Sequence, residues 1–163
     1  MPTRGPALST ALVLLALPVL SACSANAEDD ARSAAEEFLT AWADEDLAGA
    51  AGLTTDPEAA TALLEQTAED LPEGLASAEP ADGEGAVRVE DDAATLRWTP
   101  TWNMVGAPAW SYEGTLRLRQ VDDEWRVVAE PALVHPELGE GQRLVVDRTL
   151  PERAAITDAA GEP

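Results

Sequence analysis

Two side chains in this 163-residue chain have chemistry that no other residue in it shares: its single cysteine and its single histidine. Cys23 follows Ser21 and Ala22, and an uncharged apolar run over residues 7–20 precedes them. Small residues beside a cleavage point allow the backbone to lie extended in the narrow groove of a peptidase. A cysteine sulfur is a good nucleophile once it is ionised. The pattern therefore predicts cleavage before Cys23 and modification of its sulfur.

The segment around the cysteine resembles the bacterial lipobox, in which an aliphatic and two small residues precede the cysteine that receives diacylglycerol: Leu20, Ser21, Ala22 and Cys23. The apolar run follows one positive charge, Arg4, and is too short for a transmembrane helix, so it fits a secretory signal. An ordinary signal peptide with a nearby cysteine is the alternative. We expect a signal peptide over residues 1–22, a lipid on Cys23, and a short tether over 23–29 at the extracytoplasmic face of the bacterial membrane.

The histidine offers little for catalysis or metal binding because it is alone. His135 stands between Val134 and Pro136, where a corner residue hydrogen-bonded to the backbone is the simpler interpretation. Two acidic triplets, residues 44–46 and 122–124, lack the glycine and the alternating carboxylates of a calcium loop. Helix-end and turn chemistry explain both triplets. The sequence therefore predicts no metal site and no cofactor.

The composition restricts the partners of the protein. The formal net charge is −21, and all ten basic residues are arginine. So acidic a chain will not bind nucleic acid by neutralising phosphates, and anionic lipid repels it. With one cysteine there is no disulfide within the chain, so the core must form without one. The part after Cys23 is long enough for one domain with its own core.

The first part of this domain has a helical pattern. From residue 28 to residue 42 the apolar residues follow one helical stripe, and we expect the acidic residues 28–30 to occupy its first turn. A short second segment covers residues 47–53. A third helix begins with Asp56 as its N-cap and Pro57 as its first residue. It ends at Pro72, and the composition of residues 72–85 predicts a loop.

Further along, the apolar period changes to two, which is typical of strands. We expect a short strand over residues 86–90 and a longer one over 94–102, in which Pro100 marks a kink or a sheet edge. A third strand follows, with Gly114 as a bulge or bend inside it. Its apolar face carries Trp110, Tyr112, Leu116 and Leu118.

Residues 121–124 predict a hairpin turn, after which a strand returns from Trp125. Helices followed by antiparallel strands indicate an α+β fold, a cone-like domain with its helices packed on a curved antiparallel sheet. Four of the five tryptophans lie in the strand half, and we expect them to form the core.

The helix AAEEFLTAWADEDLAGAAGLT (residues 34–54), followed by a helix and a tryptophan-bearing sheet, resembles the nuclear-transport-factor-two-like cone. More particularly, the chain is similar to the form of this cone domain that stands at the N-terminus of class B penicillin-binding proteins, including the methicillin-resistance type. The specific pieces are the hairpin end at 124–128, then residues 134–138 and 141–144. The resemblance implies a cone-like domain over residues 30–138.

Residues 139–163 resemble the start of the pedestal domain that follows the cone in such proteins. The pedestal is entered through Arg-Gly-x-Ile-x-Asp-Arg-x-Gly. Ala154 and Ala159 depart from this pattern, and four residues match it: Arg153, Ile156, Asp158 and Gly161.

A transpeptidase of this type acylates through S-x-x-K and K-T-G motifs, and these 163 residues contain no lysine. The resemblance therefore implies a non-catalytic, lipid-anchored module, a spacer or docking domain among peptidoglycan-synthesis proteins and in the response to β-lactam antibiotics. One alternative is a free-standing lipoprotein whose cone binds a small apolar ligand. Another is a truncated fragment of a full transpeptidase.

The cone fold elsewhere encloses an apolar pocket, and some members place an aspartate base in it. Here the aromatic residues either line such a pocket or fill it, and we expect them to fill it. No acidic residue lies on the predicted apolar faces of residues 94–120, since Glu113 alternates outward. The aromatic candidates are Trp98, Trp102, Trp110 and Tyr112.

Overall fold

The structure, a computed structural model, describes residues 21–147 and residue 149. Three helices come first: α1 (Ser21–Ala43), α2 (Leu47–Gly52) and α3 (Pro57–Asp70). The strands and one 3-10 turn follow: β1 (Leu75–Pro80), β2 (Val87–Glu90), β3 (Ala93–Trp102), β4 (Trp110–Ser111), β5 (Gly114–Val121), β6 (Glu124–Val127) and η1 (Pro131–Leu133).

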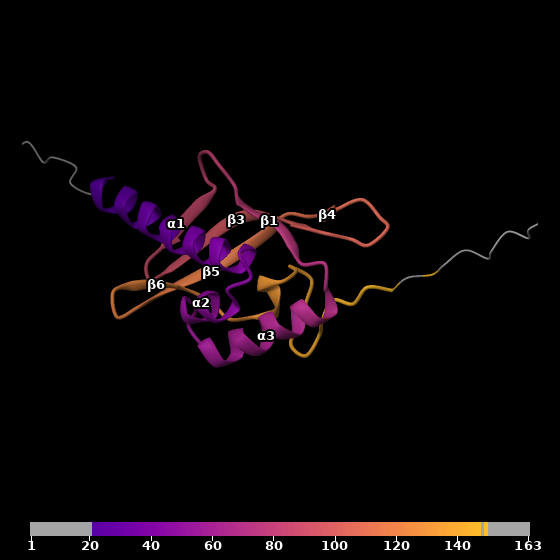
Figure 1. The fold of residues 1–163 in the computed structure, drawn as a ribbon. Coiled ribbons are helices and arrows are strands. Elements are labelled where there is room, and N and C mark those ends of the chain that lie inside the picture. The colour runs from indigo at the N-terminus through magenta and orange to yellow at the C-terminus, as the bar shows by residue number, and fades with distance from the viewer. Residues whose placement is uncertain (1–20, 148, 150–163) are drawn as a thin grey trace, which may run out of the picture.

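The strands form one antiparallel sheet centred on β3. β1 and β2 pair along one edge of β3, β4 and β5 pair along the other, and β6 extends the sheet beyond β5. The helix α1 lies across this sheet and contacts β1, β2, β3, β5 and β6 (Figure 1). The predicted α+β fold, with helices packed on a curved antiparallel sheet, is therefore confirmed.

The core lies between α1 and the inner face of the sheet. The ring of Trp42 on α1 packs against the rings of Trp98 and Trp102 on β3, with centroid separations of 5.6 Å and 5.8 Å. Phe38, one helical turn before Trp42, contacts it at 5.8 Å. The other large, fully buried side chains are Leu39, Leu64, Leu96, Pro100, Leu116, Leu118, Val127 and Val134.

Two of the four strand-half tryptophans do not belong to the buried core as expected. Trp98 and Trp102 are buried, but Trp110 and Trp125 are only partly buried. Trp110 lies in a two-residue strand at the end of the sheet, and Trp125 lies on the last strand, β6. The third buried tryptophan is Trp42, which comes from the helical half.

The first helix begins earlier than its apolar stripe. α1 starts at Ser21, so residues 28–30 are not in its first turn as expected. Among its residues from 26 onward the first buried one is Ala31, and the side chains of residues 28–30 just before it are exposed. An apolar stripe predicts only the part of a helix that packs on other elements, whereas alanine and glutamate favour helix without burial.

One strand lies where a loop was expected. β1 occupies Leu75–Pro80, inside the stretch 72–85, and pairs with β3 from Leu75 opposite Trp102 to Pro80 opposite Trp98. Its small and turn-forming residues have little strand preference of their own. These residues form a strand because they pair with the long strand β3, since strand formation depends strongly on neighbouring strands.

Pro100 lies in the central strand rather than at a sheet edge. Before Pro100, β3 pairs with β5 as far as Trp98, which lies opposite Gly114. After Pro100, β3 pairs with β4, starting at Thr101 opposite Ser111. The register is continuous across this gap, so β4 and β5 are one strand interrupted opposite Pro100. Proline has no N–H to donate, which explains why the ladder is interrupted at Thr99 and Pro100 and resumes at Thr101.

Both acidic triplets lie in turns and helix caps, as expected. The Asp46 carboxylate caps α2 by accepting a hydrogen bond from the Gly49 N–H at 2.9 Å. Asp122 and Asp123 have positive φ angles in the β5–β6 hairpin, a conformation that aspartate tolerates in two-residue turns. Among residues 21–147 and 149, no group of three or more His, Cys, Asp and Glu side chains is placed to hold a metal ion.

Candidate functional site

The aromatic residues of β3 fill the interior of the cone. Trp98 and Trp102 alternate with exposed residues along β3, so both point to the helical side, where Trp42 meets them. Both are almost completely buried. Close packing of this kind leaves no room for a ligand between these three rings. Trp98 and Trp102 therefore belong to the packed core between α1 and the sheet.

Gly114 is needed because Trp98 lies directly over it. A Cβ atom at position 114 would come within 2.5 Å of the Trp98 Nε1 atom. The predicted bulge or bend at Gly114 is wrong, since this residue starts β5 in regular register opposite Trp98. The indole Nε1 of Trp98 is buried and has no hydrogen-bond partner among the described residues. The glycine therefore provides space for a large ring rather than a change of backbone direction.

Tyr112 connects the sheet to the segment after it. Its hydroxyl accepts a hydrogen bond from the Trp102 Nε1–H at 3.2 Å and donates one to the carbonyl of Val134. Burial raises the pKa of Tyr112 to about 12, and the hydrogen bond from Trp102 opposes this shift only in part. The phenol is therefore neutral at physiological pH and acts as a structural link rather than as a base.

Trp110 and the single histidine form a stacked pair at the corner after the sheet. The rings of Trp110 and His135 are 5.7 Å apart with an interplanar angle of 19°, and Tyr112 lies 4.6 Å from the same imidazole. The His135 Nδ1 accepts a hydrogen bond from the Glu137 N–H at 3.2 Å. The predicted corner residue, bonded to backbone, is confirmed.

The four aromatic candidates do not surround one cavity. Trp102 contributes to the wall of a cavity of about 310 Å³ together with Trp42, beside α3 and the start of β1. Trp98, Trp110 and Tyr112 are not among the residues that line this cavity. Nor does an acidic group face these rings from the neighbouring strand, because Glu113 points outward and pairs with Arg97 at 3.6 Å.

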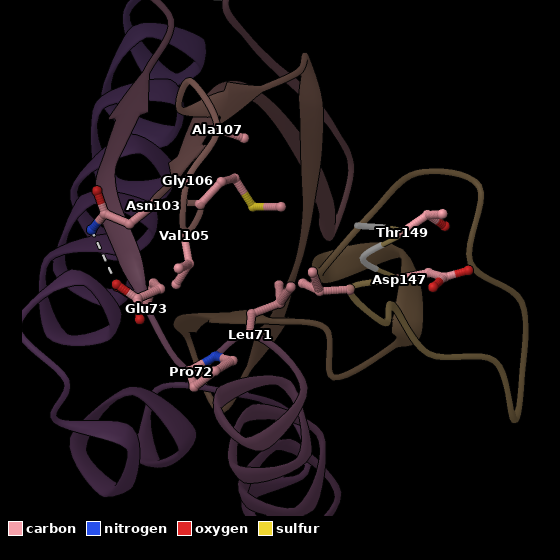
Figure 2. Close-up of a pocket in the computed structure, with 11 residues that line it drawn as sticks. Leu71, Pro72, Glu73, Asn103, Val105, Gly106, Ala107, Asp147 and Thr149 are labelled. Carbon is pink, nitrogen blue, oxygen red and sulfur yellow. Dashed lines mark hydrogen bonds between the residues drawn. The ribbon is translucent and has the colours of Figure 1, made fainter. Parts of the chain in front are cut away.

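A more distinct hollow lies at one end of the sheet, and we call it the hairpin groove. It has a volume of about 440 Å³ and lies between three segments that are far apart in the sequence (Figure 2). These are residues 71–73 after α3, residues 103–107 between β3 and β4, and the C-terminal segment around Val146. The lining residues are Leu71, Pro72, Glu73, Asn103, Met104, Val105, Gly106, Ala107, Val146, Asp147 and Thr149.

Hydrogen bonds hold the first two walls of the groove together. The Asn103 side chain donates to the Glu73 carbonyl at 3.2 Å, drawn as a dashed line in Figure 2, and its backbone N–H donates to the Gly74 carbonyl at 3.1 Å. The loop between β3 and β4 also closes a turn, in which the Ala107 N–H donates to the Met104 carbonyl at 3.3 Å.

The third wall is attached to α3 by an ion pair. The Arg143 guanidinium lies 3.0 Å from the carboxylate of Asp70, the last residue of α3. The Asp70 side chain is 12 % exposed. This contact joins residues far apart in the sequence and places the segment that contains Val146 opposite the β3–β4 loop.

The sequence pattern did not reveal this groove. Its only signals are apolar residues outside any strand or helix, Met104 with Val105 and Val145 with Val146. Neither pair has a periodicity that assigns it to a face. The groove arises from the way the fold brings three loops together, which no local pattern encodes.

The model of one protein family matches residues 30–142 of the chain, and that family is the NTF2-like N-terminal transpeptidase domain. This chain belongs to that family. The NTF2-like domain thus extends from α1 to Gln142. Two walls of the hairpin groove lie within it, and the third, around Val146, follows it.

Solved structures that are similar to this NTF2-like domain share little sequence with it. Rv3472 from Mycobacterium tuberculosis, a protein of unknown function solved as a D26N variant, is 17 % identical, with a TM-score of 0.49 over 68 % of this chain and 73 % of that one. An NTF2-like protein of unknown function from Shewanella oneidensis is 16 % identical, with a TM-score of 0.46 over 61 % and 92 %. We transfer no residue role from either. No curated protein matches the chain.

The residues of the lipobox lie at the edge of the described part of the NTF2-like protein. Leu20 is outside the described residues, whereas Ser21, Ala22 and Cys23 belong to the first turn of α1. Within the described residues, no helix has the length and apolar character needed to cross a membrane. The cleavage and lipidation expected at Cys23 stay predictions.

Proposed function

We propose that this NTF2-like protein is a non-catalytic, lipid-anchored module that acts as a spacer or docking domain beside peptidoglycan-synthesis transpeptidases, and that it contributes to the response to β-lactam antibiotics. The observation that carries this proposal is the family match over residues 30–142. Members of this family are named for their place at the N-terminus of transpeptidases. The anchor rests on Cys23 and the small residues before it.

Two further observations support a non-catalytic role. The 163 residues contain no lysine, so neither S-x-x-K nor K-T-G occurs in them. In addition, the packed rings of Trp42, Trp98 and Trp102 occupy the centre of the space between α1 and the sheet, where other cone-like proteins hold a substrate pocket. We therefore assign the function to the outer surface of the domain and to the distance at which the domain is held from the membrane.

The proposal is tested in cells that lack the gene and are complemented with variants. Wild-type protein should incorporate labelled fatty acid and restore the normal susceptibility to β-lactams. A Cys23→Ala variant should incorporate none and should fail to restore it, because the domain is then released from the membrane. Unchanged susceptibility after deletion, or full rescue by Cys23→Ala, would contradict the proposal.

A further inference from the structure

We propose that the hairpin groove binds a short apolar peptide segment of a partner protein in which basic residues flank the apolar ones. The groove is the one defined above by residues 71–73 and 103–107 together with Val146, Asp147 and Thr149. This inference rests on the docking role proposed for the domain, and it names the surface and the partner chemistry for that role.

Exposed apolar side chains gather at this groove. Of the four large hydrophobic residues that are exposed in the described part of the chain, Val105 and Val146 line the groove, and Val145 is next to it in the sequence. Their exposed fractions are 48 %, 45 % and 62 %. A local cluster of exposed apolar side chains on a soluble domain marks an interaction site more often than single ones do.

The size of the groove suits a few side chains. Its volume of about 440 Å³ lies within the range of ligand sites, roughly 300–1,000 Å³. Leu71, Pro72 and Met104 add further apolar side chains to its lining. A short extended segment with alternating apolar side chains can place two or three of them there.

The charges around the groove favour basic residues on either side of the apolar part of the bound peptide. Glu73 and Asp147 are the charged residues among those that line it, and both are acidic. The whole chain has a formal net charge of −21, which attracts cationic partners at long range and repels anionic ones. An apolar segment bordered by arginine or lysine fits both features, whereas one bordered by acidic residues is repelled.

The groove is also held in shape before any ligand arrives. The Asn103 hydrogen bonds fix the β3–β4 loop to the residues after α3, and the Arg143–Asp70 ion pair places the opposite wall. A site that is already formed loses less entropy on binding than one that must be ordered first. The groove is therefore suited to capturing a flexible segment of a neighbouring protein.

The test uses the full chain in detergent micelles and three dye-labelled peptides in fluorescence anisotropy. The peptides are Arg-Leu-Val-Leu-Arg, its Glu-flanked counterpart Glu-Leu-Val-Leu-Glu, and the polar control Arg-Ser-Ser-Ser-Arg. We expect saturable binding of the first, at least about tenfold tighter than either control. Equal binding of the Glu-flanked peptide, or no binding of the Arg-flanked one, would overturn the inference.

Variants locate the binding. Val146→Ser removes an exposed apolar contact, and Glu73→Gln combined with Asp147→Asn removes the acidic rim. Each should weaken binding of the Arg-flanked peptide by about three- to tenfold. Binding to the Glu73→Gln, Asp147→Asn double variant should also lose its dependence on salt concentration. The matched control is Val121→Ser in the β5–β6 hairpin, where a valine of similar exposure, 41 % against 45 % for Val146, lies outside the groove. Equal effects of Val146→Ser and Val121→Ser would place the binding elsewhere and refute the assignment.

The two proposals can fail separately. If groove variants still co-precipitate penicillin-labelled protein from membranes as well as wild type does, the docking role stands and the groove assignment is wrong. If the basic apolar peptide binds the groove but deletion of the gene leaves β-lactam susceptibility unchanged, the groove stands and the proposed function is wrong. A small neutral apolar molecule that competes fully with the peptide, while salt has no effect, would likewise refute the basic-segment assignment.

Discussion

The Tyr112 hydroxyl joins two parts of the molecule that are far apart in the sequence. It accepts from the buried Trp102 indole and donates to the buried carbonyl of Val134. Each of these groups would be costly to leave without a partner in the interior. Tyr112 therefore contributes to stability through its oxygen as well as through its ring.

We expect the stability of the protein to fall at high pH because of this residue. The pKa of Tyr112 is raised in the folded state to about 12 from its ordinary 10.0, so folding favours the protonated phenol. Its contribution is complete below pH 10.0 and is lost as the pH rises towards about 12. Tyr112 is the only tyrosine and the chain has no lysine, so no other residue of these types titrates in that window.

Urea unfolding between pH 9 and pH 12 measures this effect. The control is Tyr112→Phe, which should be about 1–3 kcal/mol less stable at neutral pH because the Val134 carbonyl and the Trp102 N–H lose their partner. It should also show a smaller decline across the alkaline window. A decline of the same size in both proteins would show that Tyr112 is not the group responsible.

A second prediction concerns the glycine under Trp98. Gly114→Ala places a Cβ atom 2.5 Å from the Trp98 Nε1 and forces a buried ring to move, so we expect a loss of about 1–3 kcal/mol in the free energy of unfolding. The matched control is Gly52→Ala at the end of α2, where a Cβ meets no atom within 4 Å. Chemical denaturation compares the two. Equal stabilities would mean that the core around Trp98 is looser than the structure shows.

At the scale of elements, β3 and β1 show what the sequence could and could not predict. β3 alternates apolar and polar residues over its whole length, and the structure buries the predicted face. β1 carries no such pattern, since half of its residues are alanine or proline, and it exists because β3 provides a partner. A local sequence pattern predicts a strand whose own apolar side chains pack into the core, such as β3. It does not predict a strand such as β1, which forms because a neighbouring strand is there to pair with it.

The ion pair between α3 and the C-terminal segment is an element-scale contact with a modest expected energy. Asp70 is largely buried but Arg143 is more than half exposed, so we expect a coupling energy of no more than about 1 kcal/mol in a double-mutant cycle with Asp70→Asn and Arg143→Gln. Hydrogen exchange of the amides near Val146 should increase in Arg143→Gln, while exchange in β3 stays unchanged. Unchanged exchange near Val146 would show that other contacts position this wall.

At the scale of the whole molecule, charge is the dominant surface property. A formal net charge of −21 means that acidic side chains repel one another across the folded surface. The surface ion pairs, such as Arg119 with Asp92 and Arg117 with Glu130, each have an arginine that is more than half exposed, and they offset little of this repulsion.

Salt should therefore stabilise the protein. Raising the ionic strength from about 0.01 M to about 0.15 M shortens the screening length from roughly 30 Å to 8 Å and weakens the repulsion among the carboxylates. We expect a higher midpoint of thermal unfolding at the higher ionic strength, measured by the near-ultraviolet signal of the buried tryptophans. A lower midpoint would show that the ion pairs outweigh the repulsion.

The fold class and the filling of the cone could be predicted from the sequence, because they follow from the helical stripe around Phe38 and Trp42 and from the alternation around Trp98 and Trp102. The hairpin groove could not. It depends on where Pro72, Met104 and Val146 meet, and these residues lie in irregular segments whose relative positions come only from the assembled fold.

We propose that this NTF2-like protein acts through its surface beside a transpeptidase and performs no acylation itself. The most direct test labels native membranes with a fluorescent penicillin and precipitates with an antibody raised against residues 28–150. We expect a small, unlabelled, lipidated band that carries the epitope, accompanied by a separate, labelled protein. Fluorescent label on the band that itself carries the epitope would contradict the claim, because the chain would then belong to an acylating transpeptidase.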